Sequence, residues 1–254
     1  MVEKIKYLLL FFINLFPILS FSQPNNINGL SLWLKADYGV TYDNNYRVSE
    51  WNDASGNGYI FSQSNVNQQP LYMTSIDSMN HKPAIKFDNN TLKCYQGMYI
   101  GTIFILANYD YDTFQNYDGL FTIIEYSETN AIFAVGTRGG TAFWPLNGFV
   151  GNNFYVNNNK TFDFAPLKIP KICYGFINSG IPTYWSNAMI GQDRSVSDRF
   201  WHGNIYEVII YDRTLNQNEI EQVKTYLMDK YAPPVKLPND TILNSYCPFT
   251  LKPK

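Results

Sequence analysis

The stretch Gly-Asn-Ile-Tyr-Glu-Val-Ile-Ile-Tyr at residues 203–211 predicts a strand in the interior of a β-fold. It is rich in β-branched and aromatic residues, which favour strands. Its pattern suits a strand buried on one face, and on both faces near its middle. Runs of the same character, bounded by Gly, Asn, Asp or Pro, lie upstream at residues 30–34, 84–87, 99–107, 120–124, 131–135 and 172–177. Helical periodicity is absent between them, so the sequence predicts an all-β fold.

One helix is predicted after this strand. Asn216 suits the N-cap position, and Glu219 three residues later completes a capping box. Apolar residues then recur at helical spacing, at Ile220, Val223 and Leu227. The two prolines at 233–234 end the helix. We expect its apolar face to pack against the edge or rim of the sheets.

The N-terminal segment has the pattern of a signal peptide. Lys4 and Lys6 precede an apolar stretch at residues 7–21, and small residues stand at Ser20 and Ser22, where a signal peptidase reads the chain. The stretch is shorter than the about 20 apolar residues that a membrane span needs, which disfavours the alternative of a membrane anchor. We therefore expect residues 1–22 to be a signal peptide and the protein to be secreted or on the cell surface, with no membrane span after cleavage.

The composition narrows the functional classes. The 254 residues carry a net charge of −2, and only 16% of them are charged, against roughly 25% in an average soluble domain. A nucleic-acid partner is disfavoured, because it requires a basic excess to neutralise phosphates. Aromatic residues make up 17% of the chain. They are many to bury in one domain, so some exposed rings are expected, and exposed rings can stack on sugars.

Three groups of residues resemble a known type of domain. The first is residues 32–37 with 48–58, the second is 69–72 with 82–88, and the third is 200–213 with Leu215, Glu219, Val223, 226–227 and 230–231. Together they resemble the LamG-like jellyroll domains of the concanavalin A-like lectin/glucanase superfamily, found in secreted multidomain proteins of Bacteroidetes-like bacteria. The resemblance covers residues 27–232 and is weak between residues 109 and 169.

This resemblance implies a two-sheet antiparallel jellyroll sandwich with one short C-terminal helix. Domains of this type are extracellular modules that bind glycans or proteins, and some superfamily relatives are glycoside hydrolases. Residues 233–254 are expected to be a Pro-rich linker and the beginning of a following module. The pair Cys247-Pro248 resembles the start of adhesion-type repeats. The resemblance therefore implies downstream domains of the same polypeptide, with a partner there for Cys247.

The chain has three cysteines, Cys94, Cys173 and Cys247. An exported protein can form disulfides, so a Cys94–Cys173 bond is one alternative. The other is that both are free, small and buried.

Four residues are candidate ligand contacts, and three are candidate metal ligands. Trp144, Tyr155 and Trp185 lie in segments that suit loops, and the carboxylate of Asp118 could bond a sugar hydroxyl. The three that could hold calcium through their carboxylates are Asp53, Asp110 and Asp112. For Asp53 we favour a role within the turn at residues 51–58, where Gly56 and Gly58 supply positive φ. For Asp110 and Asp112 the alternative is a solvated loop. Trp33, Trp51 and Trp201 are expected in the core.

Catalysis is not favoured by the sequence. Glu207 and Asp212 are the nearest carboxylate pair, but residues five apart on a strand point to opposite faces. The predicted function is a non-catalytic recognition or adhesion module that binds a glycan or an extracellular macromolecule. The alternatives are a glucanase-like glycoside hydrolase acting through Glu207, and a passive structural spacer.

Overall fold

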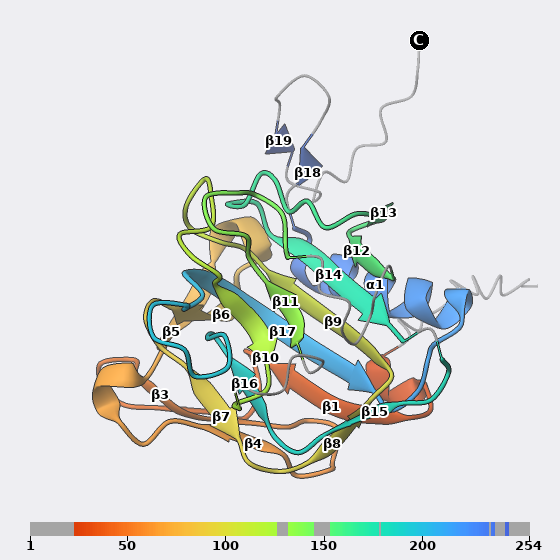
Figure 1. Ribbon diagram of the computed structural model, residues 1–254, viewed down its shortest axis with the longest axis horizontal. Coiled ribbons are helices and arrows are strands. Elements are labelled where there is room, and N and C mark those ends of the chain that lie inside the picture. The colour runs from red at the N-terminus through yellow and green to blue at the C-terminus, as the bar shows by residue number, and fades with distance from the viewer. Residues whose placement is uncertain are drawn as a thin grey trace, which may run out of the picture.

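The computed structural model describes residues 23–125, 132–144, 153–177 and 179–233, with the backbone of residues 235–236 and 242–243. In this part of the chain two large antiparallel sheets form a sandwich, and one α-helix, α1 (Gln217–Tyr231), follows the long strand β17 (Gly203–Tyr211) (Figure 1). The all-β class with a C-terminal helix, expected from the sequence, is confirmed. No helix of the described residues has the length and apolar character needed to cross a bilayer.

The first sheet, called sheet A below, is built around β17. Its order is β13-β12-β14-β9-β17-β6-β5, and β1 also pairs with β17. The strands are β1 (Leu30–Lys35), β5 (Leu71–Ile76), β6 (Lys82–Phe87), β9 (Thr102–Ala107), β12 (Phe154–Val156), β13 (Asn159–Lys160) and β14 (Lys171–Phe176). All residues of β17 are buried except the half-buried Asn204. The predicted central strand is therefore present and covered on both faces.

The second sheet, sheet B, faces sheet A across the core. Its order is β11-β10-β16-β7-β4-β3-β2. The strands are β2 (Val40–Tyr42), β3 (Val48–Asn52), β4 (Ile60–Ser62), β7 (Leu92–Cys94), β10 (Gly119–Thr122), β11 (Ile132–Val135) and β16 (Ala188–Ile190). Two small antiparallel pairs lie apart, namely β8 (Met98–Ile100) with β15 (Thr183–Trp185) and β18 (Val235–Lys236) with β19 (Ile242–Leu243). The described residues also form three short 3-10 turns: η1 (Pro24–Asn26), η2 (Val66–Gln68) and η3 (Asp77–Met79).

One predicted strand is divided in two. The sequence predicts a single strand at residues 99–107, whereas the chain forms β8 and β9, which join different sheets. The break falls at Gly101, where a Cβ atom would lie 2.3 Å from the backbone carbon of Arg213. Only glycine permits this approach, because any side chain there would collide with backbone.

The core between the sheets contains two of the three tryptophans that the sequence places in the interior. Trp51 and Trp201 are fully buried between the sheets, and Trp33 is buried in a second apolar cluster on the outer face of sheet A. Cys94 and Cys173 are both buried in the main core as free thiols. Of the two alternatives for these cysteines, the structure therefore shows the unpaired one. Cys247 lies outside the described residues.

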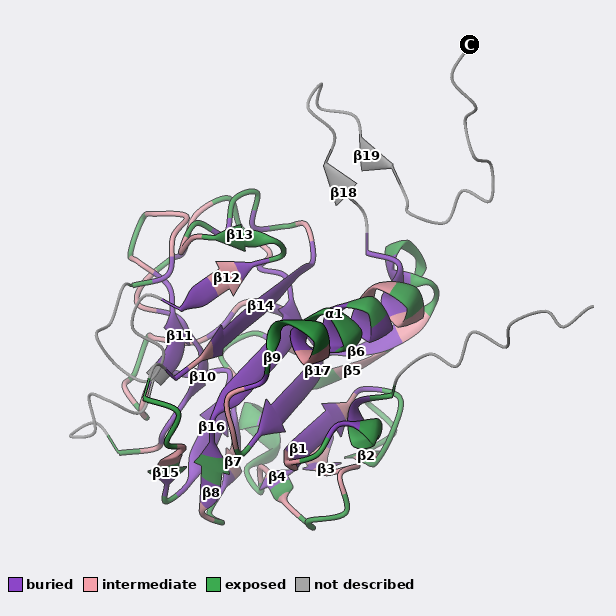
Figure 2. Cartoon of the chain, turned by 90° about the vertical axis from the view of Figure 1, so that its right-hand side faces the viewer, coloured by how far each residue is buried: buried purple, intermediate pink, exposed green. Residues whose placement is uncertain are grey.

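The helix covers a face of sheet A, and not the rim that the sequence suggested. Figure 2 shows α1 lying across the strands of this sheet, with its buried side toward them and its exposed side outward. The helix residues of the second cluster are Ile220, Val223, Tyr226, Leu227 and Tyr231. They pack on outward-facing side chains of sheet A that include Phe104, Leu106 and Ile209. The expectation was wrong because β9 and β17 carry large apolar residues on both faces, which need a cover on each side.

The capping box of α1 forms as predicted. The Asn216 Oδ1 atom accepts a hydrogen bond from the backbone N–H of Glu219 at 3.1 Å, and the Glu219 Oε2 atom accepts one from the backbone N–H of Asn216 at 2.9 Å. Arg213 adds a bidentate ion pair to Glu219. At the other end the C-cap residue Ala232 has a left-handed φ of 42°. The helix therefore ends at Tyr231, two residues before the first proline.

Candidate functional site

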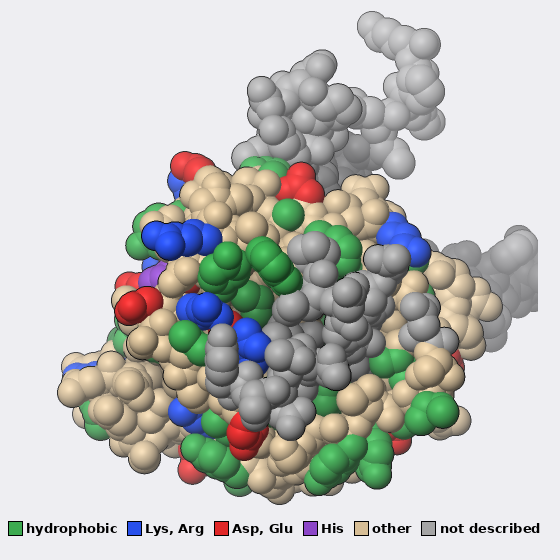
Figure 3. Space-filling model, in the orientation of Figure 1, with side chains coloured by type: hydrophobic (Ala, Val, Ile, Leu, Met, Phe, Trp, Pro, Cys, Tyr) green, Lys and Arg blue, Asp and Glu red, His purple; other side chains and the backbone are tan. Residues whose placement is uncertain are grey.

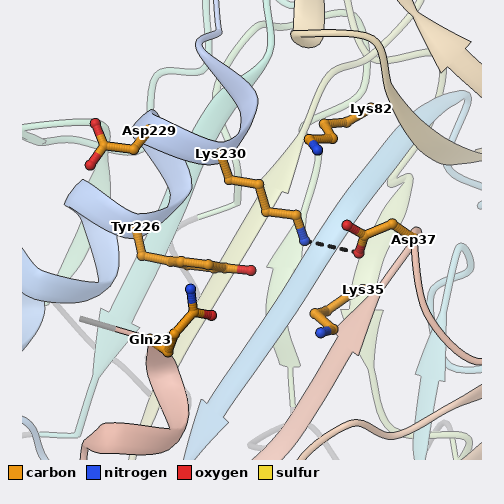
Figure 4. Close-up of a pocket in the computed structure, with 7 residues that line it drawn as sticks. All are labelled: Gln23, Lys35, Asp37, Lys82, Tyr226, Asp229 and Lys230. Carbon is orange, nitrogen blue, oxygen red and sulfur yellow. Dashed lines mark hydrogen bonds and ion pairs between the residues drawn. The ribbon is translucent and has the colours of Figure 1, made fainter. Parts of the chain in front are cut away.

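A charged cavity of about 350 Å³ lies beside the C-terminal end of α1. Its lining residues are Gln23, Lys35, Asp37, Lys82, Tyr226, Asp229 and Lys230. In Figure 4 the ammonium group of Lys230 and the carboxylate of Asp37 point toward each other, whereas Asp229 points away from them. The Lys230–Asp37 hydrogen bond measures 2.9 Å. We call this cavity the Lys230 pocket.

Behind the Lys230 pocket lies a buried carboxylate, Glu207 of β17, whose exposed fraction is 0%. It accepts hydrogen bonds from Trp33 Nε1 at 2.5 Å, Lys230 Nζ at 2.8 Å and the Tyr231 hydroxyl at 2.8 Å. Burial, together with the negative charge of Glu207, raises the pKa of Tyr231 well above its ordinary value, so this phenol remains a donor. Glu207 thus joins β1, β17 and α1 in one hydrogen-bonded centre.

This geometry gives Glu207 a structural role. Three donors surround its carboxylate, so both oxygens are engaged within the fold and neither faces a cleft where it could meet a leaving group. Asp212, the carboxylate considered with it, is exposed, and its backbone N–H bonds the carbonyl of Gly29. The two carboxylates therefore do not face a common cleft.

A second cavity, of about 260 Å³, contains the exposed ring of Trp144. Its lining residues are Tyr117, Val135, Trp144, Asp193, Arg194 and Arg199. Backbone hydrogen bonds assemble it: the Trp144 N–H donates to the Val135 carbonyl at 2.7 Å, and the Gly119 N–H donates to the Arg199 carbonyl at 3.2 Å. It thus lies where β10, β11 and the loop after β16 meet. We call it the Trp144 pocket.

The aromatic side of the Trp144 pocket is partly open to solvent. Trp144 is 43% exposed, and its ring meets Tyr117 edge to face with centroids 5.5 Å apart. The Arg199 guanidinium lies 4.9 Å from the centre of the Tyr117 ring, within cation–π range. Figure 3 shows hydrophobic side chains beside Lys and Arg side chains on the face that carries β10 and β11 in Figure 1.

The basic side of this pocket is fixed by a buried carboxylate. Asp193 is 0% exposed and accepts hydrogen bonds from Arg194 Nε at 2.7 Å, Arg194 Nη2 at 3.1 Å and Arg199 Nη1 at 2.8 Å. Charge-assisted hydrogen bonds to a buried group hold both guanidinium groups in place. The positions of both guanidinium groups are therefore set by contacts within the protein.

The loop that carries these arginines has an unusual backbone. Arg194, Ser195 and Asp198 have φ angles of 44°, 55° and 64°, in the left-handed region that costs non-glycine residues energy. The Arg194 N–H donates to Thr122 Oγ1 at 3.1 Å, which ties the loop to β10. Strained backbone of this kind concentrates at functional sites, where the surrounding structure maintains it.

Of the four expected contact residues, the Trp144 pocket includes only Trp144. Asp118 is fully buried and accepts hydrogen bonds from the Tyr109 hydroxyl at 2.6 Å and the Gln115 N–H at 2.8 Å. Burial raises the pKa of Asp118. Trp185 is 1% exposed and stacks on Phe121, and the half-buried Tyr155 stacks on Tyr174 with centroids 4.7 Å apart. Two of the four side chains, those of Asp118 and Trp185, therefore lie in the interior, although their sequence context suits loops.

The three candidate metal ligands are each engaged elsewhere. Asp53 accepts hydrogen bonds from the backbone N–H groups of Trp33 and Ser55, both at 2.8 Å, as expected for a turn carboxylate. Asp110 pairs with Lys86 at 3.1 Å, and Asp112 pairs with Lys168 at 3.0 Å. Within the part of the chain that the structure describes, no three His, Cys, Asp or Glu side chains gather in a metal-binding group.

Sequence reasoning missed the residues that accompany Trp144, namely Tyr117, Asp193, Arg194 and Arg199. The available signal was a repeated Asp-Arg pair, at 193–194 and at 198–199, in a chain with few charged residues. Such pairs usually lie on a solvated surface, so the signal alone indicates no site.

A separate stack of tyrosines was also not anticipated. The Tyr42 ring stacks on Tyr46 and on Tyr72, with centroid distances of 5.9 Å and 4.5 Å and nearly parallel planes. None of these three tyrosines lines the Lys230 pocket or the Trp144 pocket.

Comparison of the chain with protein-family models gives no match, and comparison with curated proteins gives none.

Proposed function

We propose that the protein is a secreted or cell-surface recognition module that binds a glycan in the Trp144 pocket, without catalysing a reaction on it. The sandwich of two antiparallel sheets agrees with the LamG-like, concanavalin A-like character suggested by the sequence motifs. The observation that carries the proposal is the exposed Trp144 ring, held beside two arginines that a buried carboxylate fixes in place.

The chemistry of this pocket matches the two sides of a sugar. The apolar C–H face of the ring stacks on Trp144, and the sugar hydroxyls accept hydrogen bonds from the guanidinium N–H groups of Arg199 and Arg194. A cavity of about 260 Å³ is small beside the about 300–1,000 Å³ pockets that hold drug-sized ligands. It therefore suits a unit of one sugar ring, with the remainder of a glycan outside.

Two alternatives have weaker support. A glycoside hydrolase needs two carboxyl groups about 5–10 Å apart beside the bond that it cleaves, whereas Glu207 is buried and paired with Lys230. A passive spacer needs no exposed ring held by fixed charged groups. An extracellular protein partner would use a wider surface, of which the Trp144 pocket would be one part.

The test is binding of the purified protein to a glycan array, repeated with Trp144→Ala. Truncating an aromatic anchor typically costs about 1–2 kcal/mol, which weakens binding about 5–30-fold. The matched control is Tyr95→Ala, because Tyr95 is 74% exposed and does not line the pocket. Full affinity of Trp144→Ala for every bound glycan contradicts this site. Release of reducing ends from polysaccharides, abolished by Glu207→Gln, contradicts the non-catalytic assignment.

A further inference from the structure

We infer that the Trp144 pocket selects an anionic sugar, one that bears a carboxylate or a sulfate, over a neutral sugar of the same shape. This inference rests on the proposed glycan-binding function and adds the chemical class of the ligand. It depends on the charge of the pocket, on Arg199 donors that have no partner among the described residues, and on the order of the side chains across the cavity.

The charged groups lining the pocket do not balance. Among the residues that the structure describes they are Arg194, Arg199 and Asp193, so two positive charges meet one negative charge and the sum is +1. One arginine suffices to neutralise Asp193, and Arg194 already makes a bidentate contact with it. Arg199 therefore brings a positive charge beyond the needs of the buried carboxylate.

Arg199 retains capacity to bind a ligand. Its Nη1 atom donates to Asp193, and among the described residues its guanidinium has no other hydrogen-bond partner. Its side chain is 23% exposed, against 11% for Arg194. The planar guanidinium presents a pair of donors that matches the oxygens of a carboxylate or a sulfate. Charge-assisted hydrogen bonds of this kind are about twice as strong as those to neutral hydroxyls.

The side chains of the pocket are arranged in a fixed order. Trp144 contacts Tyr117, and Tyr117 lies under the Arg199 guanidinium. Trp144 and Arg199 line the same cavity, so a sugar stacked on Trp144 has Arg199 at one edge. An acidic group at that edge of the sugar meets the unbalanced charge, whereas a neutral hydroxyl leaves it uncompensated.

The experiment compares charged polysaccharides with neutral counterparts of the same backbone. The panel holds polygalacturonate, alginate and a glucuronate-containing glycan, each with its carboxyl-reduced form, and a sulfated polysaccharide with its desulfated form. We expect at least tenfold tighter binding of an anionic member than of its neutral form at 50 mM salt. Rising salt should weaken binding of the anionic form only, because charge attraction is screened. The carboxylate and sulfate arms identify which anionic group is bound.

Variants connect the preference to Arg199. Arg199→Gln should reduce the ratio between anionic and neutral forms to near one, whereas Trp144→Ala should weaken both forms together. The control is Arg47→Gln, which removes an arginine that pairs with Asp43 and does not line the pocket. If Arg199→Gln does not fold, Arg194→Gln removes the same unit of charge.

The outcomes separate the two proposals. Equal binding of charged and neutral forms, or an unchanged preference in a folded Arg199→Gln protein, overturns the selection of an anionic sugar and leaves glycan binding intact. Failure to bind any neutral or charged glycan overturns the proposed function, and the inference with it.

Discussion

Replacement of Glu207 by Gln tests whether the hydrogen bonds of this carboxylate hold α1 against sheet A. The substitution keeps the shape of the side chain and removes its charge. An amide has one acceptor oxygen and one NH₂ donor. It cannot accept from Trp33, Lys230 and Tyr231 together, so at least one of these buried donors loses its partner.

The expected loss follows from the contacts of Lys230. Removing one partner of a buried ion pair costs about 3–5 kcal/mol. Lys230 retains Asp37 at 2.9 Å and so keeps part of its compensation. We therefore expect the lower end of the range, a decrease of about 3 kcal/mol in the free energy of unfolding. For a domain of this size that lowers Tm by about 6–12 °C.

The measurement is urea denaturation followed by tryptophan fluorescence, with thermal unfolding as a second readout. The control is Asp112→Asn, which makes the same carboxylate-to-amide change in an exposed ion pair. Asp112 and its partner Lys168, at 3.0 Å, have side chains that are 88% and 55% exposed. An exposed pair contributes about 0–1 kcal/mol, so this variant should remain close to the original protein. If Glu207→Gln and Asp112→Asn lose equal stability, the reasoning about the buried carboxylate is refuted.

Three further predictions concern local features. Asn216→Ala should lower the free energy of unfolding by about 1 kcal/mol, because α1 loses its N-cap acceptor; an unchanged urea midpoint would contradict this. Ser195→Gly should raise it by about 0.5–1 kcal/mol, because glycine adopts a φ of 55° without strain, and thermal unfolding measures the gain. Burial raises the pKa of Asp118 in the folded state, so its contribution to stability is fully present below the unfolded pKa and is lost as pH rises through the folded pKa. Asp118→Asn should remove this loss, and its free energy of unfolding relative to the original protein should rise from pH 3 to pH 8; parallel curves would show that Asp118 does not titrate in this way.

Features set by neighbouring residues could be predicted from the sequence. The capping box needs only Asn216 and Glu219, which are three positions apart. The turn at residues 51–58 needs Asp53 and the residues that follow it. The strand at residues 203–211 is indicated by its own composition, which is rich in β-branched and aromatic residues. In each case the physical cause lies within one element, so the pattern alone indicates the structure.

Features set by distant residues could not be predicted. Glu207 is buried because Trp33, 174 positions earlier, and Lys230, 23 positions later, lie against it. Trp185 and Trp144 both lie in segments that suit loops, but β15 pairs with β8 and brings Trp185 against Phe121. Whether a ring is exposed depends on which strands pair, and local composition does not determine that pairing.

Two of the buried carboxylates, Glu207 and Asp193, have different surroundings, and the difference distinguishes a structural link from a candidate binding site. Glu207 and Asp37 carry two negative charges and both pair with Lys230, and Lys35 interacts with the same two carboxylates, so two positive charges balance two negative ones. Asp193 carries one negative charge and holds two arginines, so its group has a positive charge to spare.

The two groups also differ in how exposed their cations and the neighbouring aromatic rings are. The Lys230 side chain is only 12% exposed and lies over the ring of Tyr231, which is fully buried. Arg199 lies over Tyr117, which contacts the open ring of Trp144. A buried carboxylate fixes cations in both places, but only at Asp193 does a surplus charge lie next to an exposed aromatic face. Because a ligand needs both an uncompensated group and access to it, the smaller cavity is the better candidate for recognition, although the Lys230 pocket has the larger volume.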